Sequence, residues 1–317
     1  MVKHEAMKMT MTDGTMLETK VDRADREAVG IIHIFHGMAE HMDRYEPLVN
    51  KLNERGYHVI RHNHRGHGKE IDGIRGHFDS MEQVVTDANE VQTTLRNDLG
   101  QQLPYIVIGH SMGSIIARQY AETYPETLQG LILSGTGYFP KWQGYPSFVA
   151  LKLITLLFGS TKRLDWVNHL VTGRFNKQFK PQRTVSDWIS SDHAEVDKYI
   201  KDAYSGFNVS NQLVYSVTRS MMKTGELANI QRMNKRVPVL LVSGKDDPFG
   251  ENGKGIRRLA RQLKKGGIEH ITVQLYPHKR HEVLFEKDYE NVWKHLLDWM
   301  SRQIIQKTKE SEAHEQK

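Results

Sequence analysis

The chain has 317 residues, a length that fits one large domain or two small ones and allows a substantial buried core. Its 44 Lys and Arg against 38 Asp and Glu give a formal charge of +6, which is spread along the chain and does not form the clustered basic face of a nucleic-acid-binding protein. The absence of cysteine excludes disulfides, thiolate metal sites and cysteine nucleophiles, which leaves serine or metal chemistry.

The N-terminal stretch MVKHEAMKMTMTDG lacks the apolar segment of a signal peptide. No run in the chain approaches the roughly 18 apolar residues of a membrane span. We therefore expect a cytoplasmic protein, with peripheral contact to a membrane surface as an addition that depends on the apolar segment described below.

Strand-like and helix-like segments alternate in the first part of the chain. Asp13-Gly14 suits a tight hairpin between two strands, and Gly56 is expected to end the first helix. Strands are expected at 5–12, 16–21, 29–35, 57–61, 105–108 and 128–134, and helices at 45–55, at 82–98 and after 111. This alternation predicts an α/β fold with a mostly parallel central sheet and helices on both faces.

Two polar loops follow the third and fourth of these expected strands, 29–35 and 57–61. The loop 36–41, HGMAEH, is expected at the sheet edge where open α/β folds place their ligands, although an ordinary polar loop is the alternative. The next loop contains His62, His64 and His67, which raises the possibility of a zinc site. Their spacing on a glycine-rich turn without accompanying carboxylates argues against it, so no metal ligand is expected.

The pentapeptide GHSMG at 109–113 lies between a strand pattern and a helix pattern. A chain that turns from strand to helix within a few residues forces the central residue into strained dihedrals, and Gly109 and Gly113 remove side chains that would collide there. Ser111 is expected to project from this turn, beside the N-terminal amides of the following helix. The pattern is that of a nucleophile elbow, and a glycine-rich turn with an incidental serine is the alternative.

Residues 138–228 lose the alternation of strand and helix. They contain the run 148–158, in which only Lys152 is charged and which is too short to cross a bilayer. A helical cap inserted over the ligand-binding edge of the sheet explains both features, because a cap needs an apolar underside. The run has three uses that the sequence leaves open: packing of the cap, a slot for an acyl chain, or transient contact with a membrane surface.

Alternation resumes after the expected cap, with strands at 237–243 and 271–276 and helices at 253–265 and 286–303. The chain therefore divides into a first core part, a cap, a second core part and a polar tail, with bounds at 1–137, 138–228, 229–306 and 307–317.

Three residue types that together make a proton relay occur in the order serine, acid, histidine. Ser111, Asp247 and His281 each follow an expected strand, so all three should gather at one edge of the sheet, in the chain order of α/β-hydrolases. His281 would take the proton of the serine hydroxyl and Asp247 would orient the imidazole. The backbone N–H groups of Met38 and Met112 are the two donors that this topology offers to an oxyanion. Two neighbours compete for the acid and base roles, Asp246 and His278.

The sequence resembles the monoacylglycerol lipase and lysophospholipase branch of the α/β-hydrolase superfamily, a group also labelled serine aminopeptidase-like. The resemblance runs along nearly the whole length and is most specific in HGMAEHMDRY, RGHG, GHSMG, G-x-x-D and the final HE. In that family the acid follows a glycine by three positions, which favours Asp247 over Asp246. Its histidine is followed by glutamate or a similar residue and leads into the last helix, which favours His281 over His278.

The same resemblance implies four substrate-binding residues. Glu40 and Arg44 match loop residues that face a glycerol head in monoacylglycerol lipases, His110 matches the histidine of the elbow, and Tyr199 is similar to a tyrosine of the cap. A buried site for hydroxyl groups needs such donors and acceptors, because unpaired polar groups are costly there.

Two residues depart from the family pattern. Asn63 replaces the aspartate that usually precedes the RGHG arginine by two positions, which is expected to affect loop structure more than catalysis. Met38 is bulkier than the small residue often found at the oxyanion position, and its side chain could narrow the acyl entrance.

We therefore expect a serine carboxylic-ester hydrolase that cleaves monoacylglycerols or related single-chain lipid esters through an acyl-enzyme, without a metal or organic cofactor. The oligomeric state is not predicted. A lysophospholipase is the rival within the class, if a basic cap meets a phosphate head through Lys162, Arg163, Arg174, Lys177 and Lys180. An aminopeptidase that anchors a free amine on Glu40 and a catalytically silent binding protein are further alternatives, the last disfavoured by the intact serine, acid and histidine set.

Overall fold

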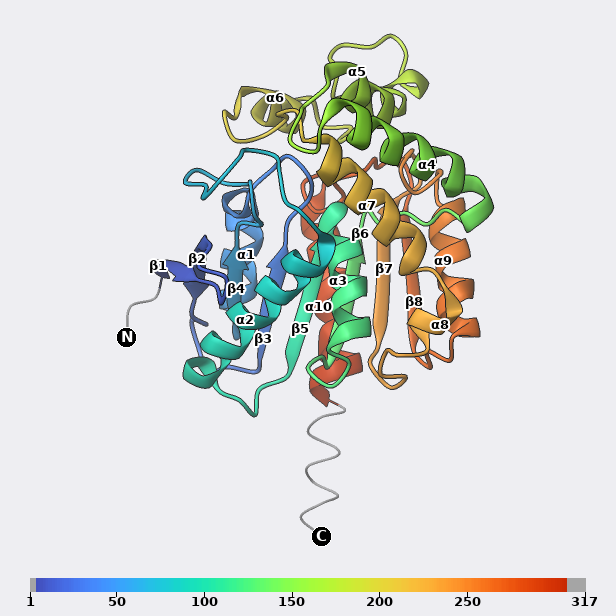
Figure 1. Ribbon diagram of the computed structural model, residues 1–317. Coiled ribbons are helices and arrows are strands. Elements are labelled where there is room, and N and C mark those ends of the chain that lie inside the picture. The colour runs from blue at the N-terminus through green and yellow to red at the C-terminus, as the bar shows by residue number, and fades with distance from the viewer. Residues whose placement is uncertain (1–3, 307–317) are drawn as a thin grey trace.

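The structure, a computed structural model, describes residues 4–306 except for the side chain of Val171. The polar tail expected at 307–317 lies outside the described residues. An eight-stranded sheet with the order β1-β2-β4-β3-β5-β6-β7-β8 forms the centre of the molecule (Figure 1). The strands are His4–Thr10, Met16–Asp22, Gly30–Phe35, Tyr57–His62, Tyr105–His110, Gly130–Ser134, Val239–Gly244 and Ile271–Tyr276, for β1 to β8.

The sheet is parallel from β4 to β8, whereas β1 and β2 pair antiparallel with their neighbours. This arrangement confirms the predicted fold class, and the hairpin between β1 and β2 turns at Asp13 and Gly14, as expected. Residues of β3 alternate between the two faces, because successive side chains of a strand point to opposite sides. Ile32 and Ile34 pack in one core cluster, and Ile31 and Phe35 in the other.

Five long helices cover the two faces of the sheet. Helix α1 (Glu46–Glu54) and helix α10 (Tyr289–Met300) pack on one face, and the other face carries α2 (Met81–Leu99), α3 (Met112–Thr123) and α9 (Lys254–Lys265). A 3-10 turn, Met42–Tyr45, precedes α1. Helix α10 begins later than the predicted residue 286, because the side chain of Glu286 accepts hydrogen bonds from Ser191 and from the Arg280 N–H.

Helices lie above the carboxyl ends of the parallel strands (Figure 1). They are α4 (Lys141–Phe158), α5 (Asp165–Asn168), α6 (His193–Lys201) and α7 (Asn211–Lys223), followed by α8 (Leu227–Ile230) beside α9. The described chain between 138 and 228 contains no strand, and we call this part the cap segment. The apolar run 148–158 forms the second half of α4, which packs against α7 with the rings of Phe148 and Tyr215 stacked 5.3 Å apart.

No helix within residues 4–306 combines the length and the apolar character needed to cross a bilayer.

Candidate active site

The turn between β5 and α3 places Ser111 in a strained backbone conformation. Its φ is 52° and its ψ is −117°, a left-handed region that non-glycine residues rarely adopt. A Cβ at Gly109 would lie 2.4 Å from the Gly113 carbonyl oxygen, and a Cβ at Gly113 would lie 2.0 Å from that of Phe35. Both glycines are therefore required, as the sequence pattern indicated.

A line of hydrogen bonds joins Ser111 to two buried residues from other loops. The Nε2 atom of His281 lies 2.9 Å from Ser111 Oγ, and Nδ1 of the same ring lies 3.1 Å from each carboxylate oxygen of Asp247. Because the carboxylate oxygens of Asp247 accept a hydrogen bond from Nδ1, the ring proton belongs on Nδ1, which leaves Nε2 free to accept the serine proton. The structure thus brings together the three residues that the sequence selected.

The environment of His281 keeps its imidazole basic. Burial lowers the pKa of His281, but the carboxylates of Asp247, Glu282 and Glu40 together raise the pKa above its ordinary value, Asp247 contributing most. Asp247 is itself held by the Phe249 N–H at 2.9 Å and the Ser243 hydroxyl at 3.1 Å. These two additional hydrogen bonds fix the direction in which the Asp247 carboxylate points.

The two competing residues lie elsewhere. Asp246 is exposed, and its backbone N–H donates to the Lys279 carbonyl. His278 is also exposed, in a turn where its φ is 58°. Within residues 4–306, neither side chain hydrogen-bonds to Ser111, whereas the buried His281 does so and is itself bonded to the buried Asp247.

The loop 36–41 lies against the serine. A Cβ at Gly37 would be 3.2 Å from Ser111 Cβ, and Met38 lines the walls of both cavities that open at Ser111. Met112 is the first residue of α3, where the backbone N–H groups of a helix have no partner within the helix. The two expected oxyanion donors therefore belong to the two segments that flank the serine.

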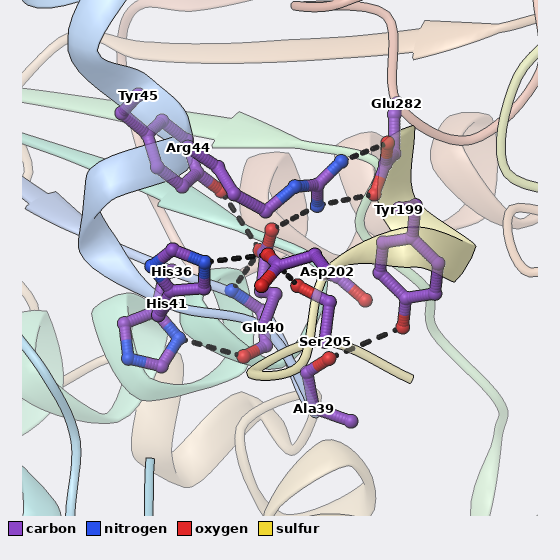
Figure 2. A network of polar contacts seen from close by, with 12 residues as sticks. His36, Ala39, Glu40, His41, Arg44, Tyr45, Tyr199, Asp202, Ser205 and Glu282 are labelled. Atoms are coloured by element: carbon purple, nitrogen blue, oxygen red, sulfur yellow. Dashed lines mark hydrogen bonds and ion pairs between the residues drawn. The ribbon is translucent and has the colours of Figure 1, made fainter. Parts of the chain in front are cut away.

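Two of the four expected head-group residues form a buried network (Figure 2). Glu40 accepts hydrogen bonds from the Gly37 N–H, from Arg44 and, at 2.9 Å, from the Tyr45 hydroxyl. Arg44 also makes two parallel bonds of 2.8 Å to Glu282. Glu40 lines a cavity at Ser111, but its oxygens are occupied by protein donors, and Arg44 does not line that cavity. Direct contact of Glu40 and Arg44 with a head group stays a prediction.

The other two expected residues face the cavity. His110 is buried, its ring lies 5.0 Å from that of His281, and burial lowers its pKa to about 4, so it is uncharged at neutral pH. In the part of the chain that the structure describes, its Nδ1 atom has no hydrogen-bond partner. Tyr199 donates its hydroxyl to the Ala39 carbonyl at 3.2 Å, and its ring lies under the Arg44 guanidinium.

Two cavities meet at Ser111. One is mostly apolar, has a volume of about 390 Å³ and lies between α3, α4 and α7, with Ile115, Leu151 and Val214 in its wall. The other has a volume of about 410 Å³ and a wall rich in polar groups. Both share Met38, Ser111, Thr172 and Trp188 as lining residues. An ester bond placed at Ser111 would have one cavity on its acyl side and the other on its alcohol side.

Sequence reasoning missed Trp188 and the contacts of Glu282. The Trp188 indole belongs to the cap segment and lies 4.7 Å from the His281 ring. The HE pair pointed to Glu282 as a family feature, but nothing in the sequence indicated that it pairs with Arg44.

The histidines of the RGHG region are buried, and two of them, His62 and His67, make hydrogen bonds inside the protein. His62 Nδ1 hydrogen-bonds to His33 Nε2 at 2.8 Å, and His67 Nε2 accepts the Ala39 N–H at 3.2 Å. Burial lowers the pKa of His62 to about 3 and that of His67 to about 4. Among the residues that the structure describes, these rings do not converge on a point where a metal could bind.

One other group of ligand types does converge, His4, Asp22 and Glu46. The guanidinium of Arg61 lies 2.7 Å from Asp22 and 2.8 Å from Glu46, so a protein cation already balances these carboxylates.

Comparison with known proteins relates the chain to a family of hydrolases. The family model described as "Serine aminopeptidase, S33" matches residues 26–288. The chain is 25% identical over 276 residues to the monoacylglycerol lipase of Mycolicibacterium smegmatis, covering 87% of this chain and 89% of that protein. It is 29% identical over 298 residues to the monoglyceride lipase of Mus musculus, covering 92% and 89%.

A solved structure also matches this chain over nearly its whole length. A thermostable carboxyl esterase from Bacillus coagulans, in complex with glycerol, matches with a TM-score of 0.86 and 26% identity over 96% of this chain and 100% of that chain. Because the family model spans most of the chain and the fold and relatives agree with it, the protein belongs to the serine aminopeptidase S33 family of hydrolases, in the monoacylglycerol lipase-like branch of the α/β-hydrolases.

Proposed function

We propose that the protein is a serine carboxylic-ester hydrolase that cleaves monoacylglycerols, or closely related single-chain lipid esters, through an acyl-enzyme. The observation that carries the proposal is the hydrogen-bonded line from Asp247 through His281 to Ser111, at the meeting point of an apolar and a polar cavity. This chemistry requires neither a metal ion nor an organic cofactor.

In the acylation step, His281 Nε2 takes the proton of Ser111 while the serine oxygen attacks the carbonyl carbon of the ester. The carbonyl electron pair moves onto its oxygen, where the N–H groups of Met38 and Met112 stabilise the negative charge. The intermediate then collapses, its bond to the alkoxy oxygen breaks, and His281 gives its proton to the leaving alcohol. Water repeats the sequence on the acyl-enzyme, which releases the fatty acid and restores Ser111.

The apolar cavity fits a single acyl chain. Its walls come from α3, α4 and α7, and Leu151, Val214 and Met221 contribute aliphatic surface to it. Each methylene group moved from water into such a cavity contributes about 0.8 kcal/mol of binding free energy. A single apolar cavity beside Ser111 supports a substrate with a single acyl chain.

The polar cavity favours an uncharged head group over a phosphate. Among the described residues that line it, none is lysine or arginine, whereas three are acidic: Glu40, Asp165 and Glu282. The basic residues that would support a lysophospholipase lie elsewhere, since Lys162, Arg163, Lys177 and Lys180 are exposed and Arg174 lines the apolar cavity. A phosphate would meet carboxylates without a cation facing it, which supports the monoacylglycerol alternative.

The arrangement of Glu40 also weighs against an aminopeptidase. An enzyme of that kind needs an acidic anchor for the free amine of its substrate, and Glu40 was the candidate. Its carboxylate already accepts hydrogen bonds from three protein donors, of which Arg44 carries a full positive charge. An incoming amine would have to displace one of them.

We further propose that residues 138–228 form a cap inserted between the core parts 1–137 and 229–306, and that α4 brings the cap to a lipid surface. One face of α4 lines the apolar cavity through Gly144, Leu151 and Ile154. The other face exposes Trp142, Leu156 and Leu157 by 79%, 70% and 77%. An exposed apolar face of this size on a monomer marks a surface that binds something apolar.

A substrate panel tests the proposed function. Monoacylglycerols, lysophospholipids, short nitrophenyl esters and aminoacyl amides are compared for the wild type and for Ser111→Ala. Selective hydrolysis of monoacylglycerols is expected, with a loss of turnover of about 10⁶ in Ser111→Ala, because the nucleophile and its base act as a unit. Preference for lysophospholipids or aminoacyl amides, or ester hydrolysis that survives Ser111→Ala in a pure sample, would contradict the proposal.

A further inference from the structure

Three segments that are distant in the sequence meet at the Arg44 guanidinium (Figure 2). Arg44 donates to Glu40, the fifth residue of the loop 36–41, and makes two bonds of 2.8 Å to Glu282, the residue after His281. Its third neighbour is the ring of Tyr199 from α6, which lies 4.9 Å from the guanidinium carbon. One buried side chain therefore contacts the candidate oxyanion loop, the loop of the base and the cap segment.

Glu40 transmits the position of Arg44 to the loop backbone. It accepts the Gly37 N–H, which belongs to the peptide just before the Met38 amide. A Cβ at Gly37 would lie 2.7 Å from Glu40 Oε1, so the backbone reaches the carboxylate only because this residue is glycine. The direction of the Met38 N–H thus depends on where Arg44 holds Glu40.

The cap segment holds the opposite side of the same loop. The Ala39 carbonyl accepts the Tyr199 hydroxyl at 3.2 Å and the Gly206 N–H at 2.8 Å. Ala39 has a φ of 54°, a conformation that costs free energy and persists only when its surroundings maintain it. The cap therefore stabilises the loop conformation in which Met38 lies beside Ser111.

The charges of the network argue for a positioning role more than for stability. The side chains of Arg44, Glu40 and Glu282 are 11%, 3% and 4% exposed, so two carboxylates share one cation almost out of contact with water. A buried ion pair contributes little net stability, because removing its members from water costs about as much as their attraction returns. Bidentate guanidinium bonds do, however, fix geometry closely.

We propose that Arg44 is a positioning residue of the site. It links the loop that presents the Met38 N–H group to the loop that carries His281, and the ring of Tyr199 from the cap segment covers this link. The proposal rests on the proposed function, since it takes one linked loop to stabilise the oxyanion and the other to carry the catalytic base. It departs from the family-based expectation for Arg44, in which this side chain faces the head group.

The proposal predicts that loss of Arg44 affects turnover but not substrate binding. Arg44 does not line either cavity at Ser111, so its loss should leave KM nearly unchanged. A displaced Met38 amide and a displaced imidazole would stabilise the transition state less well, and a shift of about 1 Å costs about 10²-fold in rate. Lysine keeps the charge but lacks the planar fork, so it can satisfy one carboxylate at a time.

The test compares Arg44→Gln, Arg44→Lys and Tyr199→Phe with the wild type on a short, water-soluble glycerol monoester. We expect kcat to fall about 10²-fold in Arg44→Gln with KM within about threefold, and Arg44→Lys to recover part of the loss. Tyr199→Phe keeps the ring on Arg44 but removes the bond to Ala39, so kcat should fall about fivefold. It also provides a folded test case if Arg44→Gln does not fold.

The matched control is Arg96→Gln. Arg96 donates to the Leu103 and Thr127 carbonyls and lies over the Tyr105 ring, at the end of β5 opposite Ser111. It is expected to lower the melting temperature without changing kcat. A kcat of Arg44→Gln within about threefold of the wild type, a loss seen in KM alone, an equal loss in Arg96→Gln, or an unchanged kcat in Tyr199→Phe would each overturn the proposal.

Failure of the proposed function would look different. In that case the wild type itself would show no ester hydrolysis that depends on Ser111, and the comparison among the Arg44 variants would have no starting activity.

Discussion

The indole of Trp188 lies against the imidazole of His281, with ring centroids 4.7 Å apart and an angle of 37° between the planes. Trp188 belongs to the cap segment and His281 to the core, so the cap forms one wall of the environment of the base. The same indole lines both cavities at Ser111. We therefore expect Trp188 to shield the hydrogen bond between His281 and Ser111 from water.

Replacing Trp188 should disturb this shielding. In Trp188→Ala, water can reach His281 Nε2 and donate a hydrogen bond to it in place of the serine hydroxyl, so kcat on a soluble glycerol monoester should fall about tenfold. Trp188→Phe keeps an aromatic ring at the same place and should retain most of the rate. Steady-state kinetics of the three proteins checks this, and equal kcat values would show that the cap does not shield the base.

The two neighbouring aspartates should differ strongly in importance. Asp247→Asn removes the charge that stabilises the imidazolium and favours the wrong ring tautomer, so turnover should fall about 10⁴-fold. Asp246→Asn changes an exposed side chain and should have little effect. Turnover numbers of both variants on one ester decide the matter, and the reverse ranking would assign the acid role to Asp246.

The pH profile should report His281. The pKa of His281 lies above its ordinary value of 6.5, because the carboxylates of Asp247, Glu282 and Glu40 together outweigh the effect of burial. The reaction needs the neutral ring, so kcat/KM should be lost as the pH falls through a pKa above 6.5. Glu282→Gln removes one carboxylate and should move this acid limb to lower pH.

Measurement of kcat/KM from about pH 5 to pH 9 tests the shift. Glu290→Gln, which changes an exposed carboxylate on α10, is the control and should leave the limb in place. The other titratable group facing the ring is His110, which is uncharged over this range because burial lowers its pKa to about 4. An acid limb that moves to higher pH in Glu282→Gln would contradict the assignment.

The apolar cavity should set the preferred chain length. Ala150 lines this cavity from an exposed position on α4, so a larger side chain there can narrow the cavity without disturbing the core. Ala150→Phe should lower activity on long-chain monoacylglycerols more than on short ones, because the buried length of the chain shrinks. Hydrolysis of an acetyl ester provides the internal control. A chain-length profile identical to that of the wild type would place the acyl chain elsewhere.

The exposed face of α4 should bind lipid. Replacing Leu156 and Leu157 by serine removes two side chains that would enter a membrane surface, each worth about 2 kcal/mol, so affinity should fall by about 10³-fold. Cosedimentation with vesicles of phosphatidylcholine and phosphatidylserine measures this affinity.

Val273→Ser, at an exposed apolar position on β8, is the control for that experiment. Activity on a soluble ester should be unchanged in the α4 variant, since neither leucine lines a cavity at Ser111. Equal vesicle binding by the wild type, the α4 variant and Val273→Ser would show that the exposed face of α4 does not bind lipid.

Much of the fold could be predicted from local patterns. The bounds of β8, Ile271–Tyr276, agree with the predicted 271–276, because a short apolar run between turn residues is a clear strand signal. The start of α10 was predicted too early, because the pattern of side chains cannot show that Glu286 is used by Ser191 and Arg280 in the loop before the helix. The run 148–158 was seen as apolar, but its membership of the longer helix α4 was not.

The sequence by itself determined the residues whose placement follows from backbone rules: Ser111 in its glycine-flanked turn, and Asp247 and His281 at the ends of neighbouring parallel strands. Tertiary structure alone decided which side chains surround them. Arg44 and Glu282 are 238 positions apart in the chain, and Trp188 contacts His281 although the two lie in separate segments of it. No local period or turn preference encodes such pairs, since they depend on how separate loops pack against one another in three dimensions.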